Sequence, residues 1–550
     1  MNDVSVLVGG KAGDGINSAG AMVAQLLNHL GYRIYLYFDY PSLIRGGHNF
    51  AIIRGREQDI GACRNHVDFV LALNAETIER HKEQFTDKTV IISNKDLVNN
   101  GGHGIPVKAI LAEEKAPAIM GNSALIGGFA RVAGIGWETV EAVFRRHIPK
   151  GADLNLAVAK RAFDMLDPVN PIKKCESQPR SLVSGNEAIG LGLVRGGLDA
   201  YVSYPMTPSS SILHFLAEEK DRFGIMVVHP ENEIAVILMA LGFAYAGKKA
   251  AIGTSGGGFC LMTEGLSLAG MAEIPVVLVV SQRTGPSTGL PTYTGQTDLQ
   301  FVLHAGQGEF PRLIVAPGDA QEALDWSDRA MDIAWKCQVP AFILVDKTLS
   351  ESTYSVDPAS ARNTVSTGEP LWDGKAPYRR YEYAASGCSP LAFPGMNDAV
   401  VKVNGYTHEE AGITVEDAGT TILMTEKRLK KGEALIKVIE DYPGVIQSGS
   451  PGASTALFCW GSTKGVCEEV AAELGLRVIR PVVLAPFPAD SINKLLAGVK
   501  RLIAVEENAT AQLAALAEQQ GIRVNAKILR YDGRPFTVEE LVLRVKEAGI

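Results

Sequence analysis

Apolar residues along this chain fall into two kinds of run. Short, largely β-branched runs predict strands, among them residues 4–9, 67–73, 89–94, 199–203, 249–254, 274–280, 340–345, 456–460 and 477–484. Apolar positions at helical spacing predict helices at residues 16–30, 122–133, 138–147, 185–196, 231–245 and 464–474. Strands that alternate with helices, and that read as continuous apolar runs, are typical of parallel sheets covered on both faces. The pattern therefore predicts an α/β protein.

Breaks in the pattern divide the chain of 550 residues, which is too long for a single core. We expect a first domain at residues 1–166, a Pro-containing polar linker at 167–181, and a second domain at 182–354. Residues 355–454 form an irregular connecting segment in which the basic stretch at 426–431 is expected to open a helix. The last domain covers residues 455–550.

Three predicted strands of the second domain lead to residues that can bind a ligand or take part in a reaction. One leads to Glu233 in the first turn of a helix, the next to the glycines at 256–258, and the third to Arg283. Taken singly, a Glu in this position is explained by its favourable interaction with the helix dipole, and a run of glycines is typical of a turn. Because ligands of open α/β sheets bind at the carboxyl ends of the strands, the three together predict a binding crevice.

A fourth strand end carries Thr207 between Pro205 and Pro208. Proline on both sides fixes an extended, rigid bend, which suits a hydroxyl that must keep one position.

The first domain begins with a strand, a glycine-rich turn that contains Gly13 and Gly15, and a helix. Such a turn can hold a phosphate at the helix N-terminus, but the G-x-G-x-x-G spacing is absent, so dinucleotide binding is not favoured. A second loop holds Arg45, Gly46 and Gly47, which suit either an anionic ligand or a plain turn.

Charge and composition exclude several classes of function. Lys and Arg number 53 against 61 Asp and Glu, a net charge of −8, and no basic run stands out, which argues against a nucleic-acid-binding surface. The N-terminus lacks a basic signal-peptide region, and no apolar run approaches the roughly 20 residues of a membrane span. We therefore expect a cytoplasmic protein.

Seven cysteines are scattered singly, without a C-x-x-C pair. This distribution predicts buried, reduced thiols and no metal or iron-sulfur site on this chain.

Several long motifs resemble a known family. These are YPMTPSS at 204–210, ENE at 231–233, TSGGGFCLMTEGLSLAGMAEIPVV at 254–277 and RTGPSTGLPT at 283–292. They resemble the α subunit of 2-oxoacid:ferredoxin oxidoreductases, in the group that carries a fused N-terminal γ domain, as 2-oxoglutarate:ferredoxin oxidoreductase does. The resemblance implies a Rossmann-like γ domain, a thiamine-diphosphate-binding PYR-like domain and a transketolase C-terminal-like domain.

The resemblance also assigns roles to residues. Glu233 would be the catalytic carboxylate that faces N1′ of the cofactor's aminopyrimidine, and Thr207 and Arg283 would hold the oxoacid. The remaining implied contacts are Ser287 and Thr288 with the substrate, Tyr204, Pro205, Gly256 and Gly257 with the cofactor, and Gly13, Gly15, Arg45, Gly46 and Gly47 with coenzyme A. The chain departs from the family pattern at Met206, where Ile is usual, at Gln307, where His is frequent, and at Ala511, where Gly is common.

The resemblance further implies a partner. GDG at 13–15 matches the start of the thiamine-diphosphate motif, but no Asn follows at the required distance. A β subunit would therefore supply Mg²⁺, the diphosphate site and a [4Fe-4S] cluster, in an (αβ)₂ heterotetramer that reduces ferredoxin. The implied reaction converts 2-oxoglutarate and coenzyme A to succinyl-CoA and CO₂, or runs in reverse as the reductive carboxylation of the reductive TCA cycle.

Three alternatives stay open at this point. The substrate can be another 2-oxoacid, such as pyruvate or a branched-chain acid. The chain can belong to a transketolase or a dehydrogenase-type E1 enzyme, which shares the PYR-like and C-terminal domains and would depend on lipoamide. It can also be a non-enzymatic scaffold that binds coenzyme A or a nucleotide.

Overall fold

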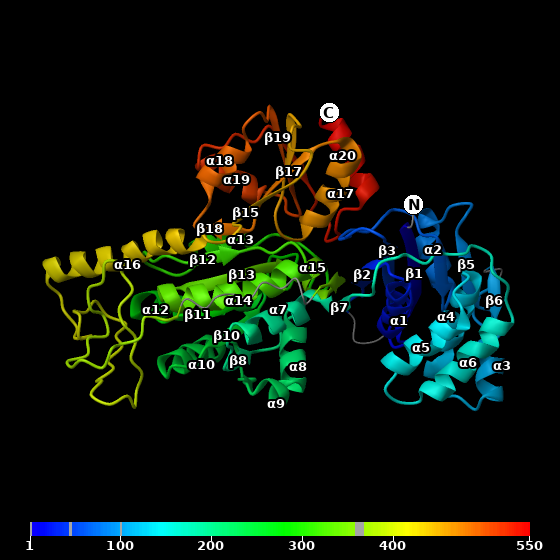
Figure 1. Ribbon diagram of the computed structural model, residues 1–550, viewed down its shortest axis with the longest axis horizontal. Helices are drawn as coiled ribbons and strands as arrows, with labels where there is room; N and C mark the ends of the chain where they lie inside the picture. Colours follow the sequence, from blue (N-terminus) through cyan, green and yellow to red (C-terminus); the bar gives the residue numbers. More distant parts are fainter. Residues whose placement is uncertain (1–2, 43–46, 100–101, 358–367, 550) are drawn as a thin grey trace. The chain divides into compact units, whose positions relative to one another are not determined.

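The computed structural model describes residues 3–42, 47–99, 102–357 and 368–549 (Figure 1). The chain forms two compact units. The first comprises Met1–Val183, Glu351–Pro358 and Phe536–Leu543, and the second Ser184–Ser350, Ala359–Pro535 and Arg544–Ile550. Both are built from sheets flanked by helices, so the predicted α/β class is confirmed.

The first unit contains a mixed sheet in the order β6-β5-β4-β1-β3-β2-β14-β7. Strands β1, β4, β5 and β6 run parallel, whereas β1 and β2 each pair antiparallel with β3. The strands are β1 (Asp3–Lys11), β2 (Arg33–Asp39), β3 (His48–Arg56), β4 (Phe69–Ala72), β5 (Val90–Asn94), β6 (His103–Ile105), β7 (Ser181–Ser184) and β14 (Thr353–Val356).

The helices of the first unit are α1 (Ile16–His29), α2 (Ala75–His81), α3 (Val107–Glu113), α4 (Gly121–Val132), α5 (Trp137–His147) and α6 (Ala152–Asp164). Every interior residue of β1, from Val4 to Gly10, is buried, as the apolar run predicts for a strand covered on both faces. The strands and helices expected in this region are confirmed to within about two residues, the usual uncertainty of element ends.

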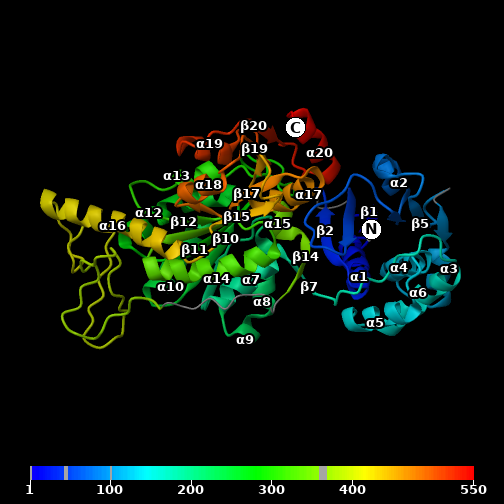
Figure 2. The ribbon, with the colours of Figure 1, turned by 45° about the horizontal axis from the view of Figure 1, so that its top comes forward.

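The second unit holds the crevice strands in a sheet of order β18-β12-β13-β11-β10-β8-β9 (Figure 2). Its strands are β8 (Ala200–Ser203), β9 (Met226–Val228), β10 (Ala250–Thr254), β11 (Val276–Gln282), β12 (Leu313–Val315), β13 (Pro340–Asp346) and β18 (Val483–Ala485). All pairs are parallel except β12 with β18. Every residue of β10, β11 and β13 is buried, so helices cover both faces of the centre of the sheet.

The helices around this sheet are α7 (Gly185–Arg195), α8 (Ser210–Glu218), α9 (Lys220–Phe223), α10 (Glu233–Tyr245), α11 (Gly256–Phe259), α12 (Thr263–Ala272), α13 (Leu299–His304), α14 (Ala320–Cys337) and α15 (Lys347–Glu351). Helix α7 begins with a capping box, in which Ser184 and Glu187 satisfy each other's backbone N–H groups.

A further sheet of order β15-β17-β16-β19-β20 follows in the C-terminal part of the second unit. Its strands are β15 (Val445–Gly449), β16 (Thr455–Phe458), β17 (Arg477–Pro481), β19 (Arg501–Glu506) and β20 (Ala526–Leu529). The helices here are α17 (Lys464–Leu474), α18 (Ala489–Leu495) and α19 (Gln512–Gln519). The last helix, α20 (Val538–Glu547), is divided between the units: its residues up to Leu543 belong to the first and the rest to the second.

The single strand expected at residues 477–484 is wrong. The run divides into β17, which belongs to the five-stranded sheet, and β18, which pairs with β12 of the seven-stranded sheet. Between them, the Val482 N–H donates to Gly444 O at 2.9 Å, and Val482 O accepts from the Ala316 N–H at 2.7 Å. The chain thus passes directly from one sheet to the other, which apolar periodicity alone does not reveal.

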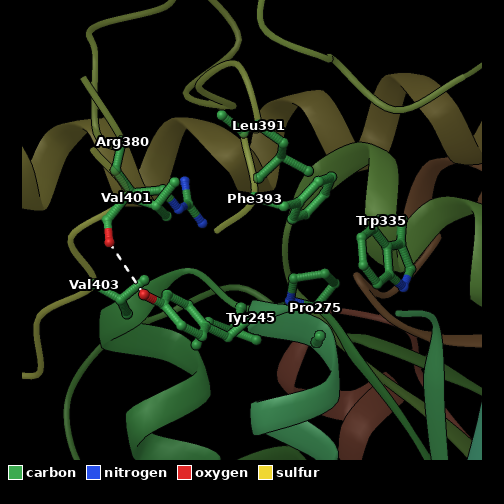
Figure 3. A pocket seen from close by; sticks show the side chains of 11 residues that line it. Tyr245, Pro275, Trp335, Arg380, Leu391, Phe393, Val401 and Val403 are labelled. Atoms are coloured by element: carbon green, nitrogen blue, oxygen red, sulfur yellow. Dashed lines mark hydrogen bonds between the residues drawn. The ribbon is translucent and has the colours of Figure 1, made fainter. Parts of the chain in front are cut away.

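Residues 368–417 of the connecting segment are largely irregular and lead into α16 (Ala418–Ile439). Figure 3 shows where it packs beside α14 and the start of β11: the rings of Phe393 and Trp335 lie 6.2 Å apart, and Tyr245 Oη donates to Val401 O at 3.1 Å. The basic stretch at 426–431 lies in the middle of α16, so the expectation that it opens a helix is wrong; Asp417 caps the helix by accepting from the Thr420 N–H.

A buried ion cluster joins α16 to α12. Glu273, which follows α12 with φ 54°, accepts from Lys427 Nζ at 2.9 Å and from Lys431 Nζ at 2.5 Å. Arg380 Nη2 donates to the Glu273 carbonyl at 2.6 Å. Burial would raise the pKa of Glu273, but the attraction of Lys431 and Lys427 holds it well below its usual range. Burial lowers the pKa of Lys427 to about 8.

All seven cysteines are free thiols, and six of them are buried. The exception is Cys260, whose exposed side chain contradicts the expectation of seven buried thiols, because it lies in a short 3-10 turn (Cys260–Met262) outside the sheet. Among the helices of the described residues, none has both the length and the apolar character needed to cross a membrane.

Replacing Glu273 with Gln is expected to destabilise the protein by roughly 3 to 5 kcal/mol, because two buried ammonium groups lose their counter-charge. Glu264→Gln is the matched control: it changes an exposed Glu of the same helix, α12, and is expected to cost less than about 0.5 kcal/mol. The urea midpoint of unfolding, followed by tryptophan fluorescence, measures both. Equal midpoints for the two variants would contradict the structural role of the cluster.

Candidate active site

The triple glycine forms the first turn of a helix and not the turn or loop that the sequence suggests. Gly256, Gly257 and Gly258 begin α11, directly after β10 and Ser255. Glycine is a poor helix former, so packing must favour this turn over local preference. Phe259, the next residue, is completely buried, which anchors the turn to the core.

Two of these glycines are each covered by a carboxyl group. A Cβ at Gly258 would lie 2.3 Å from Thr254 Oγ1 and 2.8 Å from Glu233 Oε1. A Cβ at Gly256 would lie 2.4 Å from Asp298 Oδ2. At Gly257 the nearest atom, Ser287 O, would be 3.8 Å away. The outer glycines therefore make room for carboxyl groups, whereas the exposed Gly257 leaves its backbone open to a ligand.

Glu233 is the first residue of α10 and is only 5% exposed. Asn232 caps the helix by accepting from the Ala235 N–H, so the Glu233 carboxylate is not needed as a cap. Glu231, the first carboxylate of the ENE motif, is exposed. The Glu233 carboxylate is thus shielded from water at the N-terminus of α10, where the helix dipole favours a negative charge.

Arg283 follows β11, and the structure brings it together with Thr207. Arg283 Nη1 donates to Thr207 O at 2.8 Å. The bend at Thr207 is itself fixed, because the Ser209 N–H donates to Met206 O at 2.8 Å, and Asn186 Nδ2 donates to Pro208 O at 2.8 Å. Burial lowers the pKa of Arg283 and Asp298 opposes this, but the guanidinium stays charged.

Asp298 lies in the same crevice and was not expected from the sequence. It precedes α13 but makes no side-chain cap; its carboxyl group rests on Gly256 instead. Gln282 Oε1 holds its backbone by accepting from the Asp298 N–H at 2.9 Å. Burial raises its pKa to about 6, against the lowering effects of Thr297 and Arg283. The only sequence signal is a polar Asp six residues after the end of the RTGPSTGLPT motif.

The loop after Arg283 contains Ser287 and Thr288, both exposed. Ser287 has φ 56°, in the left-handed region that a non-glycine residue seldom adopts. The Ser287 carbonyl is the atom nearest to a Cβ at Gly257, so the loop approaches the glycine turn by its backbone. Tyr204 packs beside His229, with ring centroids 5.8 Å apart, and Pro205 is exposed at the bend.

The C-terminal part of the second unit holds the segment that carries Asp298. Gln512 Nε2 donates to Thr297 O at 2.8 Å, and Gln296 Nε2 donates to Trp460 O at 2.8 Å. Glu507 exchanges two further hydrogen bonds with Gln296, at 2.7 and 2.9 Å. The backbone of Glu507 thus has a structural role, because it fixes the segment that leads to Asp298.

Gln307, which replaces the family's frequent His, lies in an exposed hollow beside Ser267 and His304. Its N–H donates to Ser267 Oγ at 2.9 Å. Ala511 adopts φ 53° before α19, which explains why glycine is common there.

The first unit contains the residues predicted for coenzyme A. Gly13 has φ 98° and Gly15 φ 74°, and the turn is closed by the Lys11 N–H, which donates to Asp14 Oδ2 at 2.8 Å. The Ala12 N–H donates to Gly47 O at 3.2 Å, which brings the two predicted loops together. Arg45 and Gly46 lie outside the described residues.

Gly258→Ala is expected to destabilise the protein by about 1 to 3 kcal/mol, because the new methyl group displaces Glu233 or Thr254. Gly257→Ala has room and is expected to be neutral or to stabilise by up to about 1 kcal/mol, through better helix propensity. Thermal unfolding of the two variants tests this difference. If Gly257→Ala lost as much thermal stability as Gly258→Ala, the close packing of Glu233 and Thr254 against Gly258 would be disproved.

Comparisons with known proteins agree with this architecture. Residues 192–427 match the family described as "Pyruvate flavodoxin/ferredoxin oxidoreductase, thiamine diP-bdg", and residues 5–165 match "Pyruvate ferredoxin/flavodoxin oxidoreductase". A 2-oxoacid:ferredoxin oxidoreductase subunit alpha from Sulfolobus sp is 30% identical over 98% of this chain and 96% of its own length. Subunit alpha of 2-oxoacid:ferredoxin oxidoreductase 2 from Aeropyrum pernix is 31% identical over 100% of this chain and 98% of its own length.

A solved structure is similar over the whole chain. It is the 2-oxoglutarate:ferredoxin oxidoreductase from Magnetococcus marinus with 2-oxoglutarate, coenzyme A and succinyl-CoA bound; it is 29% identical, covers 100% of both chains and gives a TM-score of 0.90. The full-length matches, together with a thiamine-diphosphate-binding family model over the crevice strands, show that this chain belongs to the 2-oxoacid:ferredoxin oxidoreductase α-subunit family.

Proposed function

We propose that this chain is the α subunit of a 2-oxoglutarate:ferredoxin oxidoreductase that forms succinyl-CoA and CO₂, or runs in reverse. The observation that carries the proposal is the arrangement at the strand ends: Glu233 packs against Gly258 beside the exposed Gly257, and Arg283 at the next strand end pairs with Thr207. The bound 2-oxoglutarate of the Magnetococcus marinus protein supports this acid over pyruvate.

The residues fit thiamine diphosphate, which supplies the electron sink that decarboxylation of a 2-oxoacid requires. Glu233 is dry and lies against Gly258, where a planar ring can approach the backbone because the neighbouring Gly257 carries no side chain. A buried carboxylate can stabilise a proton on a ring nitrogen, which is the role that the family resemblance gives to Glu233. Tyr204, Pro205, Gly256 and Gly257 are the proposed neighbours of the cofactor.

Arg283 is the proposed anchor of the oxoacid carboxylate. A guanidinium carries five N–H donors, and the Thr207 carbonyl accepts one of them, at 2.8 Å. This bond fixes the plane of the fork, so that the remaining donors can pair with a carboxylate at two points. Ser287 and Thr288 border the same space from the exposed loop.

A β subunit is the proposed source of the remaining half of the site. Helix α10 is apolar on its outer face too: Ile234, Leu238 and Met239 are 43 to 48% exposed, although the same helix begins with buried Glu233. Leu261 and Leu268 add to this patch. Exposed apolar patches of this kind mark protein–protein contacts. A partner on this face would exclude water from Glu233 and bring Mg²⁺, the diphosphate site and the [4Fe-4S] cluster.

The other proposed features follow from the resemblance. The first unit is the γ domain, at residues 1–166, and Gly13, Gly15, Arg45, Gly46 and Gly47 are its coenzyme A contacts. Residues 182–354 are the PYR-like domain, 355–454 the connecting segment and 455–550 the transketolase C-terminal-like domain. The assembly is a cytoplasmic (αβ)₂ heterotetramer that exchanges electrons with ferredoxin.

Arg283→Ala is expected to lower kcat/KM for the oxoacid roughly 30- to 4,000-fold. This factor corresponds to about 2 to 5 kcal/mol of lost binding free energy. The assay follows methyl viologen reduction and succinyl-CoA formation by the chain co-purified with its β partner, with 2-oxoglutarate and pyruvate compared. Arg222→Ala, at a side chain 78% exposed in the same unit, is the matched control and should leave activity unchanged. Full activity in Arg283→Ala would mean that the carboxylate is held elsewhere.

Leu238→Glu is expected to abolish co-purification of the β subunit, because it places a charge in the centre of the apolar face of α10. Val400→Glu, at a side chain 84% exposed in the connecting segment, introduces the same charge elsewhere and should leave the complex intact. Unchanged unfolding midpoints for both variants would show that they fold. A complex that still forms with Leu238→Glu would place the partner on another surface.

A further inference from the structure

Asp298 occupies a position that its local structure does not explain. An Asp directly before a helix usually caps it, but this side chain makes no cap bond to α13. Its carboxyl group is instead packed on the Cα of Gly256, where a single methyl group would collide with Oδ2 at 2.4 Å. Within the described residues, the position is kept open by a glycine and held by the Asp298 N–H bond to Gln282.

Few groups surround this carboxyl to satisfy its charge. Thr297 Oγ1 lies 3.4 Å from Oδ1, but the same hydroxyl also lies within hydrogen-bond distance of Arg283 O, at 3.2 Å. A hydroxyl has one hydrogen to donate, so these two acceptors compete for it.

Other titratable groups that face Asp298 come from two neighbouring elements. Arg283, at the end of β11, attracts the charged form. Cys260, from the turn after α11, is a thiol whose pKa is raised by burial and then by Asp298, so it stays neutral. Glu233, the first residue of α10, packs against Gly258 and not against Gly256. Asp298 is therefore a partly buried carboxyl group with a single attracting cation among these neighbours.

We propose that Asp298 is the internal counter-charge of Arg283, and that binding of an oxoacid carboxylate at Arg283 is accompanied by uptake of one proton at Asp298. The inference rests on the proposed function of Arg283. An arriving carboxylate takes over the attraction of the guanidinium and adds a like charge nearby, and both effects favour the protonated form of Asp298. Protonated, Asp298 no longer repels the substrate and can donate a hydrogen bond into the crevice. It acts as a positioning residue for the arginine.

The direction of the pH effect follows from linkage. Because burial already raises the pKa of Asp298 to about 6, the empty site loses this proton as the pH rises through 6. Substrate binding raises the pKa further, so at a pH between the pKa values of the empty and the occupied site binding recruits a proton. The KM for the oxoacid should therefore increase between pH 6 and 8, by about fivefold if the bound substrate raises the pKa by one unit.

Asp298→Asn tests the proposal, because an amide keeps the shape on Gly256 and cannot titrate. In the complex with the β subunit, the variant should show a KM for 2-oxoglutarate that is independent of pH from 6 to 8, and about tenfold below that of the wild type at pH 8, with kcat nearly unchanged. A merely structural role would not lower KM. Glu309→Gln, an exposed carboxylate of the same region, is the matched control and should keep the profile of the wild type.

Arg283→Ala, measured in the same assay, distinguishes a failure of the role proposed for Asp298 from a failure of the role proposed for Arg283. A wild-type profile in Asp298→Asn, with binding lost in Arg283→Ala, overturns the role of Asp298 and leaves the proposed function intact. Normal binding in Arg283→Ala overturns the arginine assignment instead. If Asp298→Asn fails to fold, calorimetry of glutarate binding to the wild-type complex at pH 7, in two buffers of different ionisation enthalpy, gives the answer: uptake of a proton supports the proposal, and its absence overturns it.

Discussion

The alignment of parallel strand ends is the constraint on which the site depends. Strands β8, β10 and β11 are neighbours in parallel register, so that Ser203 pairs with Gly253 and Thr254 with Val280. The residues that follow each strand must therefore emerge at one edge of the sheet. Backbone hydrogen bonds in a fully buried sheet fix this arrangement, and the side chains need only small adjustments to meet.

Close packing of polar groups against glycine backbone then gives the crevice its detail. Glu233 and Asp298 reach their positions only because Gly258 and Gly256 lack a Cβ. A run of three glycines thus does more than allow a ligand to approach: its outer members hold carboxyl groups at fixed separations along one helical turn. From the end of β11, the cation of Arg283 attracts the charge of Asp298.

Much of this fold could be predicted from the sequence, because the central strands are uninterrupted apolar runs such as residues 274–280, and because Glu233 and Arg283 follow them directly. The helical state of Gly256 could not, since local preference favours a turn and only the burial of Phe259 reverses it. Asp298 was missed because it lies in a polar stretch without periodicity, and its position depends on Gln282 and on Gln512 from more than 200 residues away. Which sheet β18 joins is likewise a tertiary property.

The passage of the chain from β17 to β18 has a mechanical consequence. Only Val482 separates a strand of the five-stranded sheet from one that hydrogen-bonds to β12, so a rotation between these two sheets would have to break the β12–β18 pairing. A hinge cannot lie at this connection. Strand β18 therefore ties the last sheet to the seven-stranded sheet, and a truncated protein that ends before residue 480 would leave β12 as an exposed edge, prone to pair with other chains.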